Sequence, residues 1–149
     1  MMLSSKPILL VEDDDVDAMT TQRALKDINV TNELVHKVNG EEAVEYLRGD
    51  GNELPFLILL DLNMPKMNGF EFLNVIKGDS VLKRIPVVVL TTSETEQNIM
   101  DSYDLGAAGY FVKPVDYKHF VEVMKTIRMY WTLNRFPNNE HLSVSADTI

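Results

Sequence analysis

The sequence predicts an α/β fold in which a doubly wound, five-stranded parallel sheet carries helices on both faces. Short apolar runs without polar alternation recur along the chain, as in strands that are covered on both sides. Segments with helical periodicity separate these runs, so strands and helices alternate. A length of 149 residues, with 45% hydrophobic and 25% charged residues, suits one globular domain with one core.

Five segments are expected to form the strands. Continuous apolar runs predict the central strands, and less uniformly apolar or shorter segments predict the strands nearer the edges. In chain order the segments are 8–11, 34–38, 56–60, 87–90 and 109–112, and the second and fifth are the edge candidates. In a doubly wound sheet, ligand chemistry is expected beyond the carboxyl ends of the strands.

Helices are expected between these strands. The first should run over 15–28, with one apolar face made by Val16, Met19, Thr20, Ala24 and Ile28. The next three each show a cap residue three positions before a carboxylate, which predicts their starts. These pairs are Asn39 with Glu42, Asn68 with Glu71, and Ser93 with Glu96.

The last helix is expected to begin near Asp116 and to bury a long apolar stripe. The stripe consists of Phe120, Met124, Ile127 and Trp131, and Val121, Met129 and Tyr130 widen the apolar surface beyond it. Some of this wider surface is therefore expected to meet a partner. We assign residues 1–134 to the domain and residues 135–149, where periodicity is lost, to a C-terminal tail.

The composition disfavours several partners and chemistries. A formal charge of −9 without a Lys/Arg cluster disfavours nucleic acids and acidic membrane surfaces. The absence of Cys removes thiol chemistry and thiolate metal sites, and it suits a reducing compartment. Lys6 precedes only a short apolar run, which is neither a signal peptide nor a membrane span, so we expect a cytoplasmic protein.

Acidic side chains follow two of the central strands. Glu12 and Asp13 come directly after the first strand and Asp61 after the third, so they should meet at one edge of the sheet. Such carboxylates repel one another unless a cation neutralises them, and hard oxygen ligands suit Mg²⁺. The sequence thus predicts a Mg²⁺ site, to which the backbone carbonyl of Asn63 could contribute.

Asp61 has a second predicted task, as a nucleophile. A carboxylate can attack a phosphoryl group and form an acyl phosphate when donors and a metal neutralise the transferred oxygens. Thr91 and Lys113 follow or end the fourth and fifth strands and could supply these donors.

Together these strand ends resemble the receiver domains of bacterial two-component response regulators. The resemblance is carried by residues 11–14, 60–69, 91–92 and 109–114, and it extends over about residues 6–130. It implies that Glu12 and Asp13 bind Mg²⁺ and that Asp61 is the phosphoacceptor. It also implies that Thr91 and Lys113 contact the phosphoryl group.

The resemblance implies further structural features. The sheet should be flavodoxin-like (CheY-like), with the strand order 2-1-3-4-5. Tyr110 falls on the aromatic switch position of the family, although plain packing of an aromatic residue on an edge strand is an alternative. The peptide bond that matches Lys113–Pro114 is usually cis in the family, but the sequence leaves its isomer open here.

Other functions were weighed against the same residues. Acidic residues after the first strand would repel the phosphate of FMN, and the chain has no glycine-rich dinucleotide or Walker motif. An aspartyl-phosphate hydrolase usually carries a second Asp two positions after the nucleophile, where this chain has Asn63. A phosphorylation-independent adaptor is disfavoured by the complete set of predicted site residues.

We therefore expect a phosphorylation-switched regulator that is not a turnover enzyme. A sensor histidine kinase should phosphorylate Asp61, and output should pass through protein contacts, because no output domain is expected after residue 113. The segment 130–137 resembles stand-alone receivers paired with phytochrome-type kinases. That resemblance implies a homodimer through the last helix, the sheet edge and the tail.

Overall fold

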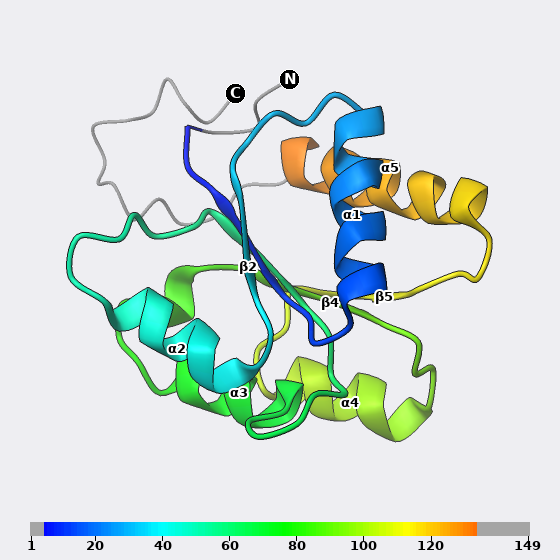
Figure 1. Cartoon of the computed structure of the whole chain (residues 1–149). Helices are drawn as coiled ribbons and strands as arrows, with labels where there is room; N and C mark the ends of the chain where they lie inside the picture. Colours follow the sequence, from blue (N-terminus) through cyan, green and yellow to red (C-terminus); the bar gives the residue numbers. More distant parts are fainter. Residues whose placement is uncertain (1–4, 134–149) are drawn as a thin grey trace.

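A computed structural model of the chain describes residues 5–133 and shows one parallel sheet between two layers of helices (Figure 1). The strand order is β2-β1-β3-β4-β5, which confirms the predicted fold class and the predicted edge strands. The strands are β1 (Ile8–Val11), β2 (Leu34–Lys37), β3 (Leu57–Leu60), β4 (Val87–Thr91) and β5 (Gly109–Val112). The predicted tail, residues 135–149, lies outside the described residues.

Helices α1 and α5 cover one face of the sheet, and α2, α3 and α4 cover the other (Figure 1). The helices are α1 (Asp15–Asp27), α2 (Gly40–Arg48), α3 (Gly69–Lys77), α4 (Glu96–Asp104) and α5 (Tyr117–Leu133), with a 3₁₀ turn η1 (Leu82–Arg84) before β4. Among residues 5–133, each helix is too short or too polar to cross a lipid bilayer.

Alternate residues of the central strands enter two separate apolar cores. In β1, Ile8 and Leu10 pack with the α1 and α5 layer, whereas Leu9 and Val11 pack with the α2 and α3 layer. This follows from the two-residue period of a strand, which sends neighbouring side chains to opposite faces. Burial of each Leu, Ile or Val side chain contributes about 1.5–3 kcal/mol to the stability of the fold. The sheet therefore holds the residues at the ends of its strands in stable positions.

The predicted apolar face of the first helix is partly wrong. Ala24 and Ile28 are buried, but Val16 and Met19 are 69% and 68% exposed. The buried side of α1 is instead made by Ala18, Thr21, Ala24 and Leu25. Ala18 and Ala24 lie in the core that α1 shares with the sheet and α5, where their small side chains allow close packing.

Two of the three predicted helix caps are confirmed and the third is wrong. Asn39 accepts a hydrogen bond from the backbone N–H of Glu42, and Asn68 forms a complete capping box with Glu71. The cap of α4 is Thr95 rather than Ser93. Ser93 belongs to the β4–α4 loop, where its hydroxyl oxygen accepts a hydrogen bond from Asn98 Nδ2 at 2.6 Å.

The last helix begins at Tyr117, directly after Asp116, and buries the stripe that the sequence predicts. Phe120, Met124, Ile127 and Trp131 all belong to the core on the α1 side of the sheet. Met129 and Tyr130 remain 61% and 37% exposed. The wider apolar surface of α5 is therefore accessible on the described part of the chain.

Candidate functional site

The register of the sheet brings the predicted site residues to its carboxyl edge. Val11 pairs with Leu60 across β1 and β3, so Glu12 and Asp61 leave the sheet side by side. Backbone hydrogen bonds continue one step beyond the strands: Asp61 N–H donates to the Val11 carbonyl at 3.0 Å, and Lys113 N–H donates to the Thr91 carbonyl at 2.7 Å. Hydrogen bonds between neighbouring strands thus fix the backbone positions from which these side chains extend.

Glu12, Asp13 and Asp61 form an acidic cluster that could hold a metal ion. One carboxylate oxygen from each lies within 4.8 Å of the others, and Glu12 and Asp61 are buried whereas Asp13 is exposed. Hard carboxylate oxygens at this spacing suit a divalent cation such as Mg²⁺ or Mn²⁺. Asn63 is exposed in the loop after β3, and its predicted role as a carbonyl ligand stays a prediction.

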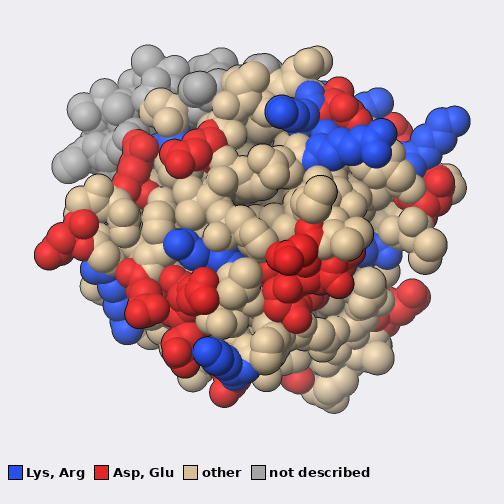
Figure 2. Space-filling view, viewed as in Figure 1, with Lys and Arg blue, Asp and Glu red and all other residues tan. Residues whose placement is uncertain are grey.

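The viewed surface around the start of α1 is acidic (Figure 2). Asp13, Asp14 and Asp15 are exposed there, while Lys and Arg side chains gather towards the other end of this helix layer. Asp14 caps α1 by accepting a hydrogen bond from the backbone N–H of Asp17 at 2.9 Å. Asp14 therefore caps the helix, and it is not part of the acidic cluster.

Burial governs the charge state of Glu12. Its side chain is 2% exposed, and this desolvation raises the pKa of Glu12 to about 7, although the Lys113 ammonium favours the ionised form. One carboxylate oxygen also accepts a hydrogen bond from the backbone N–H of Asp14 at 3.2 Å. A cation at the cluster would favour the ionised carboxylate, since opposite charge lowers a carboxyl pKa.

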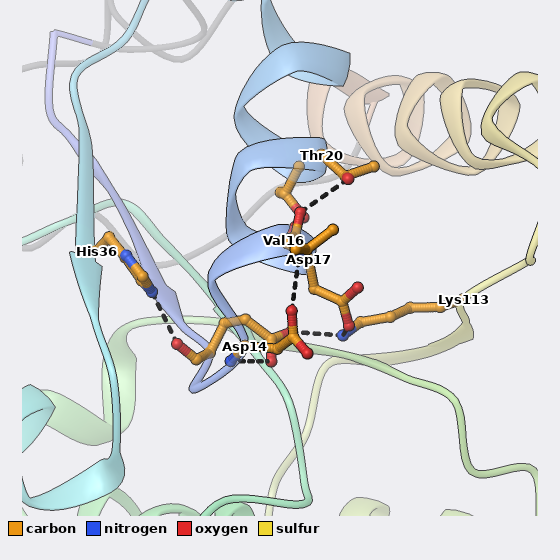
Figure 3. Close-up of polar contacts among 8 residues, drawn as sticks. Asp14, Val16, Asp17, Thr20, His36 and Lys113 are labelled. Carbon is orange, nitrogen blue, oxygen red and sulfur yellow. Dashed lines mark hydrogen bonds and ion pairs between the residues drawn. The ribbon is translucent and has the colours of Figure 1, made fainter.

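Lys113 reaches into the site from the end of β5 and binds two carboxylates (Figure 3). Its Nζ atom donates to Glu12 Oε1 at 2.5 Å and to Asp17 Oδ2 at 3.0 Å. Burial alone would lower the pKa of Lys113, but these hydrogen bonds and the charge of Asp61 raise it. The ammonium is thus held charged in a nearly buried position, with a side chain that is 8% exposed.

Asp17 was missed by the sequence reasoning. The residue lies in the first turn of α1, which carries Asp15 as well, so charge alone does not single it out. The only signal in the sequence is its place one helical turn beyond the strand-end acidic residues. Its contact with Lys113 joins positions 96 residues apart and depends on the tertiary fold.

Thr91 ends β4 with its side chain fully inside the protein. Within the described residues, its Oγ1 atom is buried and has no hydrogen-bond partner. A buried hydroxyl without a partner costs about 1–3 kcal/mol, which makes it an unusual feature of a folded core. The hydroxyl is free to donate to an acceptor that arrives at this edge of the sheet.

Tyr110 lies on β5 in a half-buried position. Its hydroxyl donates to the carbonyl of Ser93 in the β4–α4 loop at 2.8 Å, and burial raises the pKa of its phenol. The ring packs against the core on the α2 and α3 side of the sheet. The side chain therefore both packs and links β5 to the loop that begins at Thr91.

The loop after Asp61 is held by close backbone contacts. A Cβ atom at Gly69 would lie 2.7 Å from the Asp61 carbonyl oxygen, so only glycine fits without a shift. Gly40, at the start of α2, donates its N–H to the Met67 carbonyl at 3.0 Å. Lys66 adopts a left-handed backbone with φ of 62°, a conformation that is uncommon for residues other than glycine.

The structure gives the isomer of the Lys113–Pro114 peptide bond, which the sequence leaves open. No cis peptide bond occurs among residues 5–133, so this bond is trans. The two isomers of an X–Pro bond differ by only about 0.5–1 kcal/mol in general, so the family resemblance alone does not fix the isomer. Lys113 nevertheless reaches Glu12 in this conformation.

The arrangement suits chemistry at Asp61. Its buried carboxylate lies beside two further carboxylates that could share a cation, and in the field of the Lys113 ammonium. Thr91, at the end of the neighbouring strand β4, has a hydroxyl without a hydrogen-bond partner among the described residues. Position 63 supplies an amide, which cannot act as a general acid or base. These features favour acceptance of an anionic group over rapid hydrolytic turnover.

Comparison with known proteins agrees with this geometry. Residues 8–125 match the response regulator receiver domain family. The chain is 41% identical over 130 residues to the response regulator Rcp1 of Synechocystis sp., covering 85% of this chain and 88% of that relative. It is 38% identical over 134 residues to the probable methanogenesis regulatory protein FilR2 of Methanothrix harundinacea, covering 87% and 86%.

Solved structures share the fold over nearly the whole chain. The phosphorylated cyanobacterial phytochrome response regulator RcpA has a TM-score of 0.83 and 42% identity, covering 91% of this chain and all of that one. The Mn²⁺-bound form of Rcp1 has a TM-score of 0.81 and 39% identity, covering 89% and 99%. The chain therefore belongs to the response regulator receiver domain family, the phosphorylation-switched signalling proteins of two-component systems.

Proposed function

We propose that Asp61 is the phosphoacceptor of this receiver domain. The observation that carries the proposal is a buried Asp61 carboxylate next to Glu12 and Asp13, in the field of the Lys113 ammonium. Glu12, Asp13, Asp61 and the Asn63 carbonyl would hold Mg²⁺. When bound, Mg²⁺ would neutralise the carboxylates and the oxygens of the incoming phosphoryl group.

Asp61, Lys113 and Thr91 have separate roles in the proposed phosphoryl transfer. One Asp61 oxygen forms the new bond to phosphorus as the bond between phosphorus and the donor's leaving group breaks. The Lys113 ammonium and the Thr91 hydroxyl donate hydrogen bonds to the transferred oxygens. Thr91 is supported in this role because its hydroxyl has no other partner among the described residues.

Tyr110 and the β4–α4 loop form the proposed switch. A phosphoryl group that binds the Thr91 hydroxyl would shift the β4–α4 loop. In this loop the Ser93 carbonyl accepts a hydrogen bond from the Tyr110 hydroxyl, so Tyr110 would be affected too. The loop leads directly into α4, where Met100 and Tyr103 are 56% and 50% exposed. Phosphorylation should therefore alter the surface of α4 and β5, in the sense of a shift between two populated states.

The proposed donor is a sensor histidine kinase of the phytochrome type. Support comes from RcpA, a phytochrome response regulator, and from Rcp1, to which this chain is similar along most of its length. The absence of Cys suits the reducing cytoplasm, where we place the exchange. Output would pass through protein contacts, and Asn63 would leave dephosphorylation slow rather than catalytic.

We also propose that the protein forms a homodimer through α5, the β5 edge of the sheet and the C-terminal segment. Exposed Met129 and Tyr130 on α5 lie on the apolar surface that such a contact would cover. Sedimentation at high micromolar concentration, with and without a phosphoryl analogue, should show a dimer. A monomer in both conditions would refute this part of the proposal.

Labelling by a small phosphodonor tests the central assignment. Wild-type protein should take up one phosphoryl group per chain in a Mg²⁺-dependent reaction, and Asp61→Asn should take up none. Asp50→Asn, which changes an exposed carboxylate after α2, is the matched control and should label like wild type. Retained labelling of Asp61→Asn would overturn the assignment of the phosphoacceptor.

A further inference from the structure

The Lys113 ammonium is shared between two carboxylates of very different exposure. An ammonium has three N–H donors, and two of them are used here by Glu12 Oε1 and Asp17 Oδ2. The Glu12 side chain is 2% exposed, whereas the Asp17 side chain is 43% exposed. Water can therefore replace Lys113 at Asp17, but not at Glu12.

This difference decides which contact Lys113 can give up. Removing a partner from a buried charge is strongly unfavourable, whereas an ion pair that is partly open to solvent contributes little. A phosphoryl group on Asp61 would offer Lys113 a more highly charged acceptor. The ammonium can turn towards that acceptor at the expense of Asp17 while it keeps its contact with Glu12.

Asp17 is fixed in place by its own helix. Its backbone N–H donates to Asp14 Oδ1 at 2.9 Å, and its carbonyl accepts the Thr21 hydroxyl at 2.9 Å. From the first turn of α1 the carboxylate points towards the end of the Lys113 side chain (Figure 3). The carboxylate thus holds Lys113 from a rigid element rather than from a loop.

We propose that Asp17 is a positioning residue that holds the Lys113 ammonium on the α1 side of the site and competes for it with a phosphoryl group on Asp61. Asp17 sets how readily the unphosphorylated protein releases Lys113 to the phosphoryl group. This inference rests on the proposed function, because it concerns the use of Lys113 at a phosphorylated Asp61.

Beryllium fluoride with saturating Mg²⁺, used as a phosphoryl analogue, tests the competition. Asp17→Asn should bind it about threefold more tightly than wild type, as expected for the loss of one partly exposed ion pair. Asp15→Asn is the matched control, because it removes the same charge from the same turn of α1. It should change the affinity less than Asp17→Asn does.

A second comparison asks whether Asp17 acts through Lys113. In a Lys113→Gln background, Asp17→Asn should leave the affinity for beryllium fluoride unchanged, since no ammonium remains to be shared. With Lys113 present, Asp17→Glu keeps the negative charge, so its affinity for beryllium fluoride should be closer to that of wild type than to that of Asp17→Asn. A merely structural role of Asp17 would not produce this dependence on Lys113.

The outcomes separate this inference from the proposed function. If wild type binds the analogue but Asp17→Asn binds it no more tightly than Asp15→Asn, the competition is refuted and Asp61 keeps its role. An equal gain from Asp17→Asn in the Lys113→Gln background refutes it as well. If binding by wild type does not depend on Asp61, both proposals fall.

Discussion

The last apolar residues of β1, β3 and β4 and the polar residues next to them are almost equally buried, but they affect the protein in opposite ways. Val11, Leu60 and Leu90 are 0–2% exposed, and Glu12, Asp61 and Thr91 are 0–7% exposed. The apolar residues stabilise the sheet by leaving water. Glu12 and Asp61 repel each other, burial raises the pKa of Glu12, and the Thr91 hydroxyl has no hydrogen-bond partner among residues 5–133.

The difference between these regions shows where stability and function separate in this fold. The apolar cores are complete without a ligand, whereas the carboxyl edge has groups that a cation and a phosphoryl group would satisfy. Substitutions in the cores should therefore weaken the fold, and some substitutions at the edge should strengthen it while they remove function. Under the proposed function, the switch would act through these groups at the carboxyl edge.

Phe72→Ala should give the largest loss of stability. The Phe72 ring is fully buried between α3 and the sheet. Truncation of such a ring removes buried area and leaves a cavity, which costs about 3–5 kcal/mol. Urea unfolding should report this loss, and a loss below about 1 kcal/mol would show that the α3 side of the core is not tightly packed.

Gly69→Ala should affect both regions, because Gly69 lies where α3 meets the loop after Asp61. The new Cβ would lie 2.7 Å from the Asp61 carbonyl oxygen and 2.7 Å from Leu62 Cα, so backbone atoms must move. We expect a loss of about 1–3 kcal/mol and slower phosphorylation of Asp61.

Gly78→Ala is the control for this effect. It makes the same change at the end of α3, where the nearest atom to the new Cβ is 3.6 Å away. Its phosphorylation rate should match that of wild type. Equal rates for the two variants would contradict a role of Gly69 in placing Asp61.

Thr91→Val should produce the smallest change in stability and one of opposite sign. Valine keeps the shape of the side chain and removes a hydroxyl that has no partner among the described residues. The free energy of unfolding should rise by about 1 kcal/mol. Phosphorylated Thr91→Val should also lose the change in amide hydrogen exchange over α4 that we expect for phosphorylated wild type.

A fall in stability of Thr91→Val would indicate a bonded Thr91 hydroxyl, which would contradict the comparison of the two regions. An unchanged response of α4 to phosphorylation would separately remove Thr91 from the switch.

The sequence predicted the fold well because its strongest signals are local. Short unbroken apolar runs such as 57–60 are typical of strands covered on both faces, and Asn68 with Glu71 marks a helix start within four residues. The face of α1 was misjudged because Val16 and Met19 look like core residues, while alanines fill the close contact between α1, the sheet and α5.

The sequence predicted which residues lie at the site, but it did not predict all of their side-chain contacts. Strand ends place Glu12, Asp61, Thr91 and Lys113 at one edge by topology alone. The partner of Lys113 on α1, Asp17, could not be found, because side-chain contacts across 96 positions depend on the packed structure. Ser93 was taken for a helix cap because Ser is a favoured cap residue and Glu96 follows it by three positions, but the helix begins at Glu96 and Thr95 caps it.

The most direct test of the account measures the free energy of unfolding with Mg²⁺ and beryllium fluoride. A ligand that binds only the folded state raises this free energy in proportion to the logarithm of its concentration. Wild type should be stabilised by the two together, and Asp61→Asn should be more stable than wild type without ligands but gain nothing from beryllium fluoride. Equal stabilisation of both proteins by beryllium fluoride would contradict the assignment of Asp61 as the phosphoacceptor.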